Sequence, residues 1–188
     1  MNTITSLPNL LTLLRIIAIP IFIIAFYLPV SWAHLLAALI FAVACLTDLL
    51  DGYLARKLKL ISPFGAFLDP VADKLIIASS LVLLVGTKNI PYITIPAVVI
   101  VGREIVVSAL REWMAEIGKR ASVTVSYVGK FKTAIQMVAI FLLIGYVPLN
   151  SWWGTIGFIM LYMAAILTMW SMIMYLIIAW PQIKIQKI

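Results

Sequence analysis

Long apolar segments restrict the possible folds of this chain more than any other feature. A helix needs about 20 mostly apolar residues to cross a bilayer. The segments that reach this length are Leu7–Leu28, Trp32–Arg56, Pro63–Gly86, Ile90–Trp113, Val128–Val147 and Trp152–Trp180. With 64% hydrophobic and 11% charged residues, the chain is far more apolar than a soluble domain. We therefore expect an all-α, polytopic membrane protein with six transmembrane helices, forming a single domain over residues 1–188.

The basic residues predict how these helices are oriented. The connectors at 28–31, 87–89 and 148–151 together contain one lysine. The opposite helix ends carry Arg56, Lys57, Lys59, Lys119, Arg120, Lys130, Lys132, Lys184 and Lys187. Because basic residues stay on the cytoplasmic side, we expect both termini to be cytoplasmic. The net charge of +7 then indicates membrane orientation and contact with anionic lipid, not binding of nucleic acid.

All four aspartates lie in one short part of the chain. Asp48 and Asp51 are three residues apart, and Asp69 and Asp73 are four apart, so each pair lies on one helix face. The short connector between the two segments makes them antiparallel neighbours, which brings both pairs to a similar depth. Charged groups inside an apolar segment usually face a partner or a water-filled cavity.

Four carboxylates in one cleft predict a site for hard cations. Oxygen ligands without histidine or cysteine favour Mg²⁺, Mn²⁺ or Ca²⁺, and the single Cys45 and His34 do not support zinc chemistry. Four carboxylates can hold two ions, an arrangement suited to phosphoryl transfer. Two alternatives stay open at this point. The acids could form salt bridges with Arg56, Lys57 and Lys74, or they could line the cation or proton path of a transporter.

The spacing around the aspartates resembles the signature of the CDP-alcohol phosphotransferase family. The chain reads Asp48-x2-Asp51-Gly52-x2-Ala55-Arg56-x8-Gly65-x3-Asp69-x3-Asp73, and all eight fixed positions match. The resemblance extends to the segments 8–15, 65–74, 103–113 and 128–133, where it is closest to the bacterial members that make phosphatidylglycerol phosphate.

This resemblance implies an enzyme that joins CDP-diacylglycerol to sn-glycerol 3-phosphate and gives phosphatidylglycerol phosphate and CMP. It also implies a homodimer of six-span subunits in the bacterial inner membrane, with the active site facing the cytoplasm. The four aspartates would hold two Mg²⁺ or Mn²⁺ ions on the diphosphate. Asp73 would be the general base, a metal ligand, or both. The residues expected to contact CDP-diacylglycerol are Gly52, Ala55, Arg56, Ser62, Gly65, Asn9 and Thr12.

The acceptor carries a phosphate, which requires a cationic pocket. The candidates for glycerol 3-phosphate binding are Arg103, Arg111, Lys130, Lys132 and Arg15. Such a cluster argues against serine as the acceptor, because serine has no phosphate, but it does not separate glycerol phosphate from inositol phosphate. A transporter would need ionisable groups deeper in the membrane, whereas these acids gather toward one face. The Met-rich segment 160–174 is expected to be a plain helix in lipid.

Overall fold

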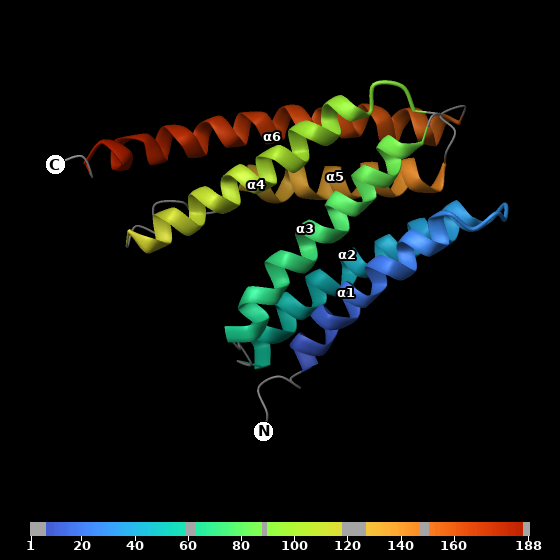
Figure 1. Ribbon diagram of the computed structural model, residues 1–188, viewed down its shortest axis with the longest axis horizontal. Coiled ribbons are helices and arrows are strands. Elements are labelled where there is room, and N and C mark those ends of the chain that lie inside the picture. The colour runs from blue at the N-terminus through green and yellow to red at the C-terminus, as the bar shows by residue number, and fades with distance from the viewer. Residues whose placement is uncertain (1–6, 59–62, 88–89, 118–126, 147–150, 186–188) are drawn as a thin grey trace.

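The computed structural model describes residues 7–58, 63–87, 90–117, 127–146 and 151–185 (Figure 1). In these ranges the chain forms the helices α1 (Leu7–Phe26), α2 (Ala33–Leu58), α3 (Pro63–Gly86), α4 (Thr94–Glu116), α5 (Tyr127–Gly145) and α6 (Trp152–Ile185). No strand occurs in the described ranges. The prediction of an all-helical chain is confirmed, and every predicted segment corresponds to one helix.

Most helix ends differ from the prediction by one to five residues, and α6 runs furthest beyond it, to Ile185 instead of Trp180. Two of the differences have a local backbone reason. α4 begins at Thr94, later than expected, because Tyr92 has a φ of 59° that a right-handed helix does not contain. α1 ends at Phe26, earlier than expected, because Pro29 disfavours the helical conformation in the residue before it. At other ends the sequence signals hold: Pro63 opens α3, where its missing N–H costs nothing.

Two helices are long and apolar enough to cross a membrane by length and composition. These stretches are Asn9–Phe26 of α1 and Trp152–Ile177 of α6. α2 and α5 contain shorter apolar stretches, Ala33–Asp48 and Phe131–Gly145. The remaining described helices carry more charge, and much of it belongs to the candidate site. Within the described residues, length and composition therefore support a membrane-spanning role directly for two helices.

The helices pack closely at one end of the molecule and spread apart at the other (Figure 1). The ends of α1, α3 and α5 and the starts of α2, α4 and α6 lie at the closely packed end. The start of α1 and the end of α6 lie at the spread end. The main hydrophobic core draws on all six helices, with Phe22, Phe41, Leu81, Ile100 and Ile140 among its buried members. A core shared by all six helices supports the proposal of a single domain.

A smaller hydrophobic cluster joins α4 to α6. It consists of Val107, Met114, Tyr175 and Ala179, all of which are buried. These residues come later in α4 and α6 than those of the main core, and so lie toward the spread end. This contact fixes α6 beside α4 at the level where charged side chains begin.

Gly157 allows close packing between α5 and α6. A Cβ added there would lie 2.9 Å from the Cβ of Leu142 and 3.2 Å from the carbonyl oxygen of Ala139. We expect Gly157→Ala to destabilise the fold by about 1–3 kcal/mol, the usual cost of overpacking a well-packed core.

Thermal unfolding of the protein in detergent measures this effect, with Gly102→Ala in α4 as the matched control. No heavy atom lies within 4 Å of a Cβ built at Gly102. The control should therefore keep or slightly raise stability, because alanine favours helix by up to about 1 kcal/mol. Equal stability of the two variants would contradict the close-packing account.

Candidate active site

Two of the motif aspartates share one arginine. Asp48 of α2 and Asp73 of α3 line the same cavity. Nη1 of Arg15, on α1, donates to Oδ1 of Asp48 at 3.0 Å and also to Oδ1 of Asp73. The Arg15 side chain is fully buried, whereas those of Asp48 and Asp73 are 27% and 40% exposed. The two carboxylates therefore point from different helices toward one region that already holds a positive charge.

α1 supports the acids with a second side chain. The hydroxyl of Thr12 donates to Oδ1 of Asp69 on α3. Thr12 and Arg15 are three residues apart, so one face of α1 meets the acids of both α2 and α3. Asn9, one turn earlier, is buried on the same helix. The structure thus places Arg15 beside the acids, and Arg15 is not among the residues that line the cavity.

Several predicted site residues fall outside what the structure describes. Ser62 lies outside the described residues, and side chains are not described for Asp51, Gly52, Ala55, Arg56 and Lys130. The first four of these five lie on α2, and Lys130 lies on α5. Gly65 is buried on α3. Among the side chains that are described, no three acids, histidines or cysteines lie close enough to hold a metal ion.

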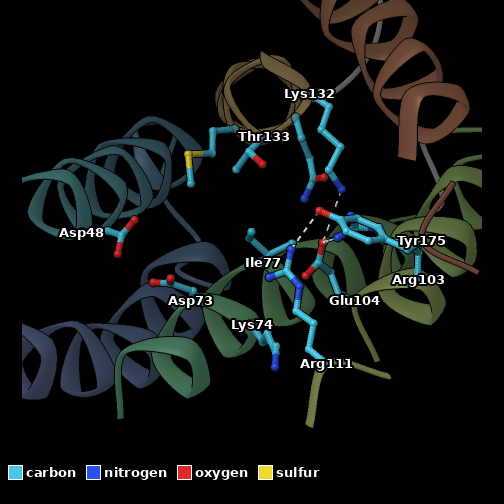
Figure 2. A pocket seen from close by; sticks show the side chains of 12 residues that line it. Asp48, Asp73, Lys74, Ile77, Arg103, Glu104, Arg111, Lys132, Thr133 and Tyr175 are labelled. Atoms are coloured by element: carbon cyan, nitrogen blue, oxygen red, sulfur yellow. Dashed lines mark hydrogen bonds and ion pairs between the residues drawn. The ribbon is translucent and has the colours of Figure 1, made fainter. Parts of the chain in front are cut away.

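Four cationic side chains also line the cavity (Figure 2). They are Lys74 of α3, Arg103 and Arg111 of α4, and Lys132 of α5. Figure 2 shows the two aspartates on the left and most of the cations on the right. The cavity has a volume of about 220 Å³. The fold therefore joins the acids and three of the predicted acceptor-binding residues in one site.

Glu104 lies among these cations and offsets part of their charge. Its Oε1 is 2.8 Å from Nη1 of Arg103 and 3.6 Å from Nζ of Lys132. Both cationic side chains are buried, and burying them without an anion would be costly. With one glutamate among four cations, the cation cluster keeps an excess of positive charge. This excess suits an anionic ligand.

Sequence reasoning missed several residues of the site. The sequence predicted no role for Glu104. An acid next to Arg103 in an apolar helix nevertheless indicates a paired charge at a polar site. Lys74, treated only as a possible salt-bridge partner, instead donates to the hydroxyl of Ser108 on α4. Tyr175 lines the cavity from α6, beyond the segment assigned to lipid contact. The polar residues that interrupt apolar α6 were the signal for its role.

Comparison with known proteins gives a consistent result. The family model for CDP-alcohol phosphatidyltransferase matches residues 5–180. A relative from Pseudomonas fluorescens is 52% identical over 180 residues, covering 95% of this chain and 92% of its own. Relatives from Pectobacterium atrosepticum and Escherichia coli (strain K12) are 55% and 52% identical over 171 residues, each covering 91% of this chain and 93% of its own. All three are named CDP-diacylglycerol–glycerol-3-phosphate 3-phosphatidyltransferase.

The chain therefore belongs to the CDP-alcohol phosphatidyltransferase family. The eight-position motif predicted this membership, and the comparison confirms it over almost the whole chain.

Proposed function

We propose that this protein transfers the phosphatidyl group of CDP-diacylglycerol to sn-glycerol 3-phosphate, giving phosphatidylglycerol phosphate and CMP. The names of its relatives agree with this reaction. The observation that carries the proposal is the cavity itself, in which motif aspartates lie opposite a cluster of arginines and lysines. Such a site can hold a diphosphate through metal ions on one side and a second, phosphate-bearing substrate on the other.

The donor side of the site has the chemistry of a divalent metal centre. Asp48, Asp51, Asp69 and Asp73 would hold two ions, Mg²⁺ or Mn²⁺, because their oxygens are the ligands these hard cations prefer. The guanidinium of Arg15 between Asp48 and Asp73 supports this fit, since it shows that the acids converge where positive charge is accommodated. When bound, the ions would neutralise the diphosphate and the departing CMP phosphate.

Asp73 is the proposed acceptor of the proton from the attacking hydroxyl group. Its carboxylate lines the cavity and is 40% exposed, so a hydroxyl group can approach it. The acceptor oxygen forms a bond to the β-phosphorus, its proton passes to Asp73, and the bond from that phosphorus to the CMP oxygen breaks. CMP leaves with the bonding electron pair. One oxygen of Asp73 can serve this role while the other binds metal.

The remaining donor contacts follow from the motif and from α1. Arg56 would pair with the nucleotide phosphates, as guanidinium groups do with phosphate oxygens. The proposed contacts with CDP-diacylglycerol are Gly52, Ala55, Arg56, Ser62, Gly65, Asn9 and Thr12. The burial of Asn9 and Thr12 near the acids supports their place in this set.

The acceptor side would bind the phosphate of glycerol 3-phosphate. Arg103, Arg111 and Lys132 line the cavity, and Lys130 lies two residues before Lys132 on α5. Because a phosphomonoester is close to a dianion at neutral pH, several cations in a small polar cavity match its charge.

The fold also supports a membrane arrangement with six spans. The start of α1 and the end of α6 lie at one end of the molecule, as an even number of spans requires. Trp32, Trp152 and Trp153 are exposed at the opposite end, where an aromatic belt would meet the outer interface. We propose that the site faces the cytoplasm from the bacterial inner membrane. The family resemblance adds the proposal of a homodimer.

Two alternatives differ in what they require of the molecule. A cation or proton transporter needs a polar path through the whole span. The half of the molecule beyond the site is filled instead by the main hydrophobic core. An enzyme with inositol phosphate as acceptor would need the same cations, whereas serine would not.

The deciding experiment offers the purified protein each acceptor separately. CDP-diacylglycerol and Mg²⁺ or Mn²⁺ are supplied with labelled sn-glycerol 3-phosphate, inositol phosphate or serine. We expect label to enter lipid only from glycerol 3-phosphate. Arg111→Gln should raise KM for this acceptor about 10- to 100-fold, because one charge-assisted contact is worth roughly 1.5–3 kcal/mol. Transfer to serine at a comparable rate would overturn the choice of acceptor.

A further inference from the structure

α6 carries three polar side chains on one face of an otherwise apolar helix. Thr168, Ser171 and Tyr175 are three and four residues apart, which places them on the same face. All three are buried. Burying a hydroxyl group in apolar surroundings costs free energy unless it is hydrogen-bonded. The partners of these hydroxyls therefore indicate what this face does. We call these three residues the α6 hydroxyl face.

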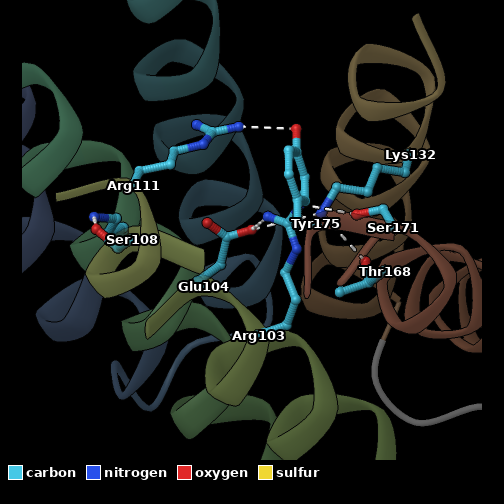
Figure 3. A network of polar contacts seen from close by, with 9 residues as sticks. Arg103, Glu104, Ser108, Arg111, Lys132, Thr168, Ser171 and Tyr175 are labelled. Atoms are coloured by element: carbon cyan, nitrogen blue, oxygen red, sulfur yellow. Dashed lines mark hydrogen bonds and ion pairs between the residues drawn. The ribbon is translucent and has the colours of Figure 1, made fainter. Parts of the chain in front are cut away.

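Two members of the α6 hydroxyl face contact buried cations of the cavity (Figure 3). Oγ of Ser171 accepts a hydrogen bond from Nη2 of Arg103 at 2.9 Å. Oγ1 of Thr168 lies 3.5 Å from Nζ of Lys132, at the outer limit for a hydrogen bond. Glu104 contacts both cations from the other side. Each cation is thus held between a hydroxyl group of α6 and one shared carboxylate.

Tyr175 makes the most extensive contact of the three. Its hydroxyl oxygen accepts a hydrogen bond from Nη2 of Arg111 at 3.0 Å. Its ring lies against two guanidinium groups, with the Cζ atoms of Arg111 and Arg103 at 5.2 and 5.7 Å from the ring centre. Both distances fall within the range of about 6 Å for attraction between a cation and a ring. One side chain therefore sets the spacing of both arginines.

We propose that the α6 hydroxyl face positions the cations that bind the acceptor phosphate. This inference rests on the proposed function. Long basic side chains lose up to about 2 kcal/mol of rotamer freedom when they are ordered. Holding them in place before the substrate arrives removes part of this cost from binding. A hydroxyl oxygen that accepts from a cation uses only one of its N–H groups and leaves the others for the phosphate.

The proposal assigns α6 a part in acceptor affinity and none in donor binding. The motif aspartates come from α2 and α3, and Asp48, Asp69 and Asp73 contact side chains of α1. The contacts of the α6 hydroxyl face go to α4 and α5. Loss of a hydroxyl from this face should therefore weaken the binding of glycerol 3-phosphate and leave the binding of CDP-diacylglycerol unchanged.

Tyr175→Phe tests this most cleanly, because it removes one hydroxyl and keeps the ring between the two arginines. We expect KM for glycerol 3-phosphate to rise about tenfold or more, as expected for losing one hydrogen bond to a charged group. KM for CDP-diacylglycerol and kcat should stay within about twofold of their values in the unaltered protein. A contact that stabilises the bound acceptor and the transition state equally changes KM for the acceptor and leaves kcat unchanged. Calorimetric titration of the metal-loaded protein with glycerol 3-phosphate should show the same loss in Kd.

Paired substitutions separate the hydroxyl contacts from simple packing. Ser171→Ala and Thr168→Val should raise KM for the acceptor, and Ser171→Thr and Thr168→Ser should restore it because they keep a hydroxyl. Thr155→Val is the control on the same helix. Thr155 lies at the other end of α6, where its hydroxyl contacts the carbonyl oxygen of Ser151. This control should leave both KM values unchanged.

The outcomes distinguish this inference from the proposed function. If the unaltered protein transfers nothing to glycerol 3-phosphate, the proposed function fails. If that protein is active and Tyr175→Phe leaves KM for the acceptor unchanged, only the α6 inference fails. An equal rise of both KM values in Tyr175→Phe would also overturn it, because that pattern marks a general structural defect.

Discussion

Asp73→Asn is expected to reduce kcat by about 10²–10⁴-fold, the range that loss of a positioned general base produces. An amide has nearly the shape of a carboxylate but cannot take the acceptor proton, and it is a poor ligand for a hard cation. Its oxygen can still accept a hydrogen bond from Arg15, as Asp73 does in the structure. We therefore expect the variant to fold normally. The measurement is steady-state transfer of labelled glycerol 3-phosphate into lipid.

The control for this variant is Lys57→Gln, which changes an exposed charge on α2. Both variants should elute and melt like the unaltered protein, and only Asp73→Asn should lose turnover. Near-normal turnover of Asp73→Asn would remove Asp73 from its proposed role. Normal turnover restored by higher Mn²⁺ would assign Asp73 to metal binding alone.

Arg15→Gln should lower stability more when divalent metal is absent than when it is present. The side chain of Arg15 is fully buried, and it supplies positive charge to both Asp48 and Asp73. Removing one partner of a buried ion pair costs about 3–5 kcal/mol, and partial exposure of the two acids reduces this to about 2 kcal/mol here. At this chain length the loss corresponds to a fall in Tm of about 4–8 °C.

Thermal unfolding in detergent with EDTA, and then with excess Mn²⁺, measures this effect. Metal ions at the acids would replace the lost positive charge, so Mn²⁺ should recover most of the Tm. Arg15→Lys keeps the charge and should lose less than Arg15→Gln in EDTA. An Arg15→Gln variant with an unchanged Tm in EDTA would contradict the role of Arg15 as the counter-charge of these acids.

The motif predicted the family and the reaction because its spacing is itself structural information. Positions three and four apart must share a helix face, and the short connector makes α2 and α3 neighbours. The order and direction of the helices also predicted that the acids and the basic residues lie close together. Lys132 and Arg103 line the cavity from helices whose ends near these residues are predicted to be cytoplasmic by the pattern of basic residues. Family membership is confirmed by the comparisons, whereas the individual residue roles stay proposals.

The position of Arg15 could not be predicted in the same way. Its place beside Asp48 and Asp73 depends on how α1 is rotated against α2 and α3. That rotation is set by packing around residues such as Phe22 and Phe41, which lie far from the motif. Periodicity assigns a residue to a helix face, but it does not say which neighbour that face meets.

The α6 hydroxyl face was missed for a different reason. The long apolar stretch of α6 satisfies the criterion for a membrane span, so its few hydroxyl residues add little to any average. The contacts with Arg103 and Arg111 show that Ser171 and Tyr175 meet the arginines of the cavity. In an apolar helix, polar residues spaced three and four apart indicate a polar face that contacts other polar groups in the protein.

The central claim is that the acids and the cations form one active site that couples donor cleavage to acceptor transfer. The most direct test is a single-turnover reaction with excess enzyme, donor labelled in the cytidine and acceptor labelled in the glycerol. The account predicts that CMP release and label incorporation into lipid have the same rate and a ratio of one to one. It also predicts that CMP release requires glycerol 3-phosphate. CMP release at the same rate without acceptor would contradict the claim.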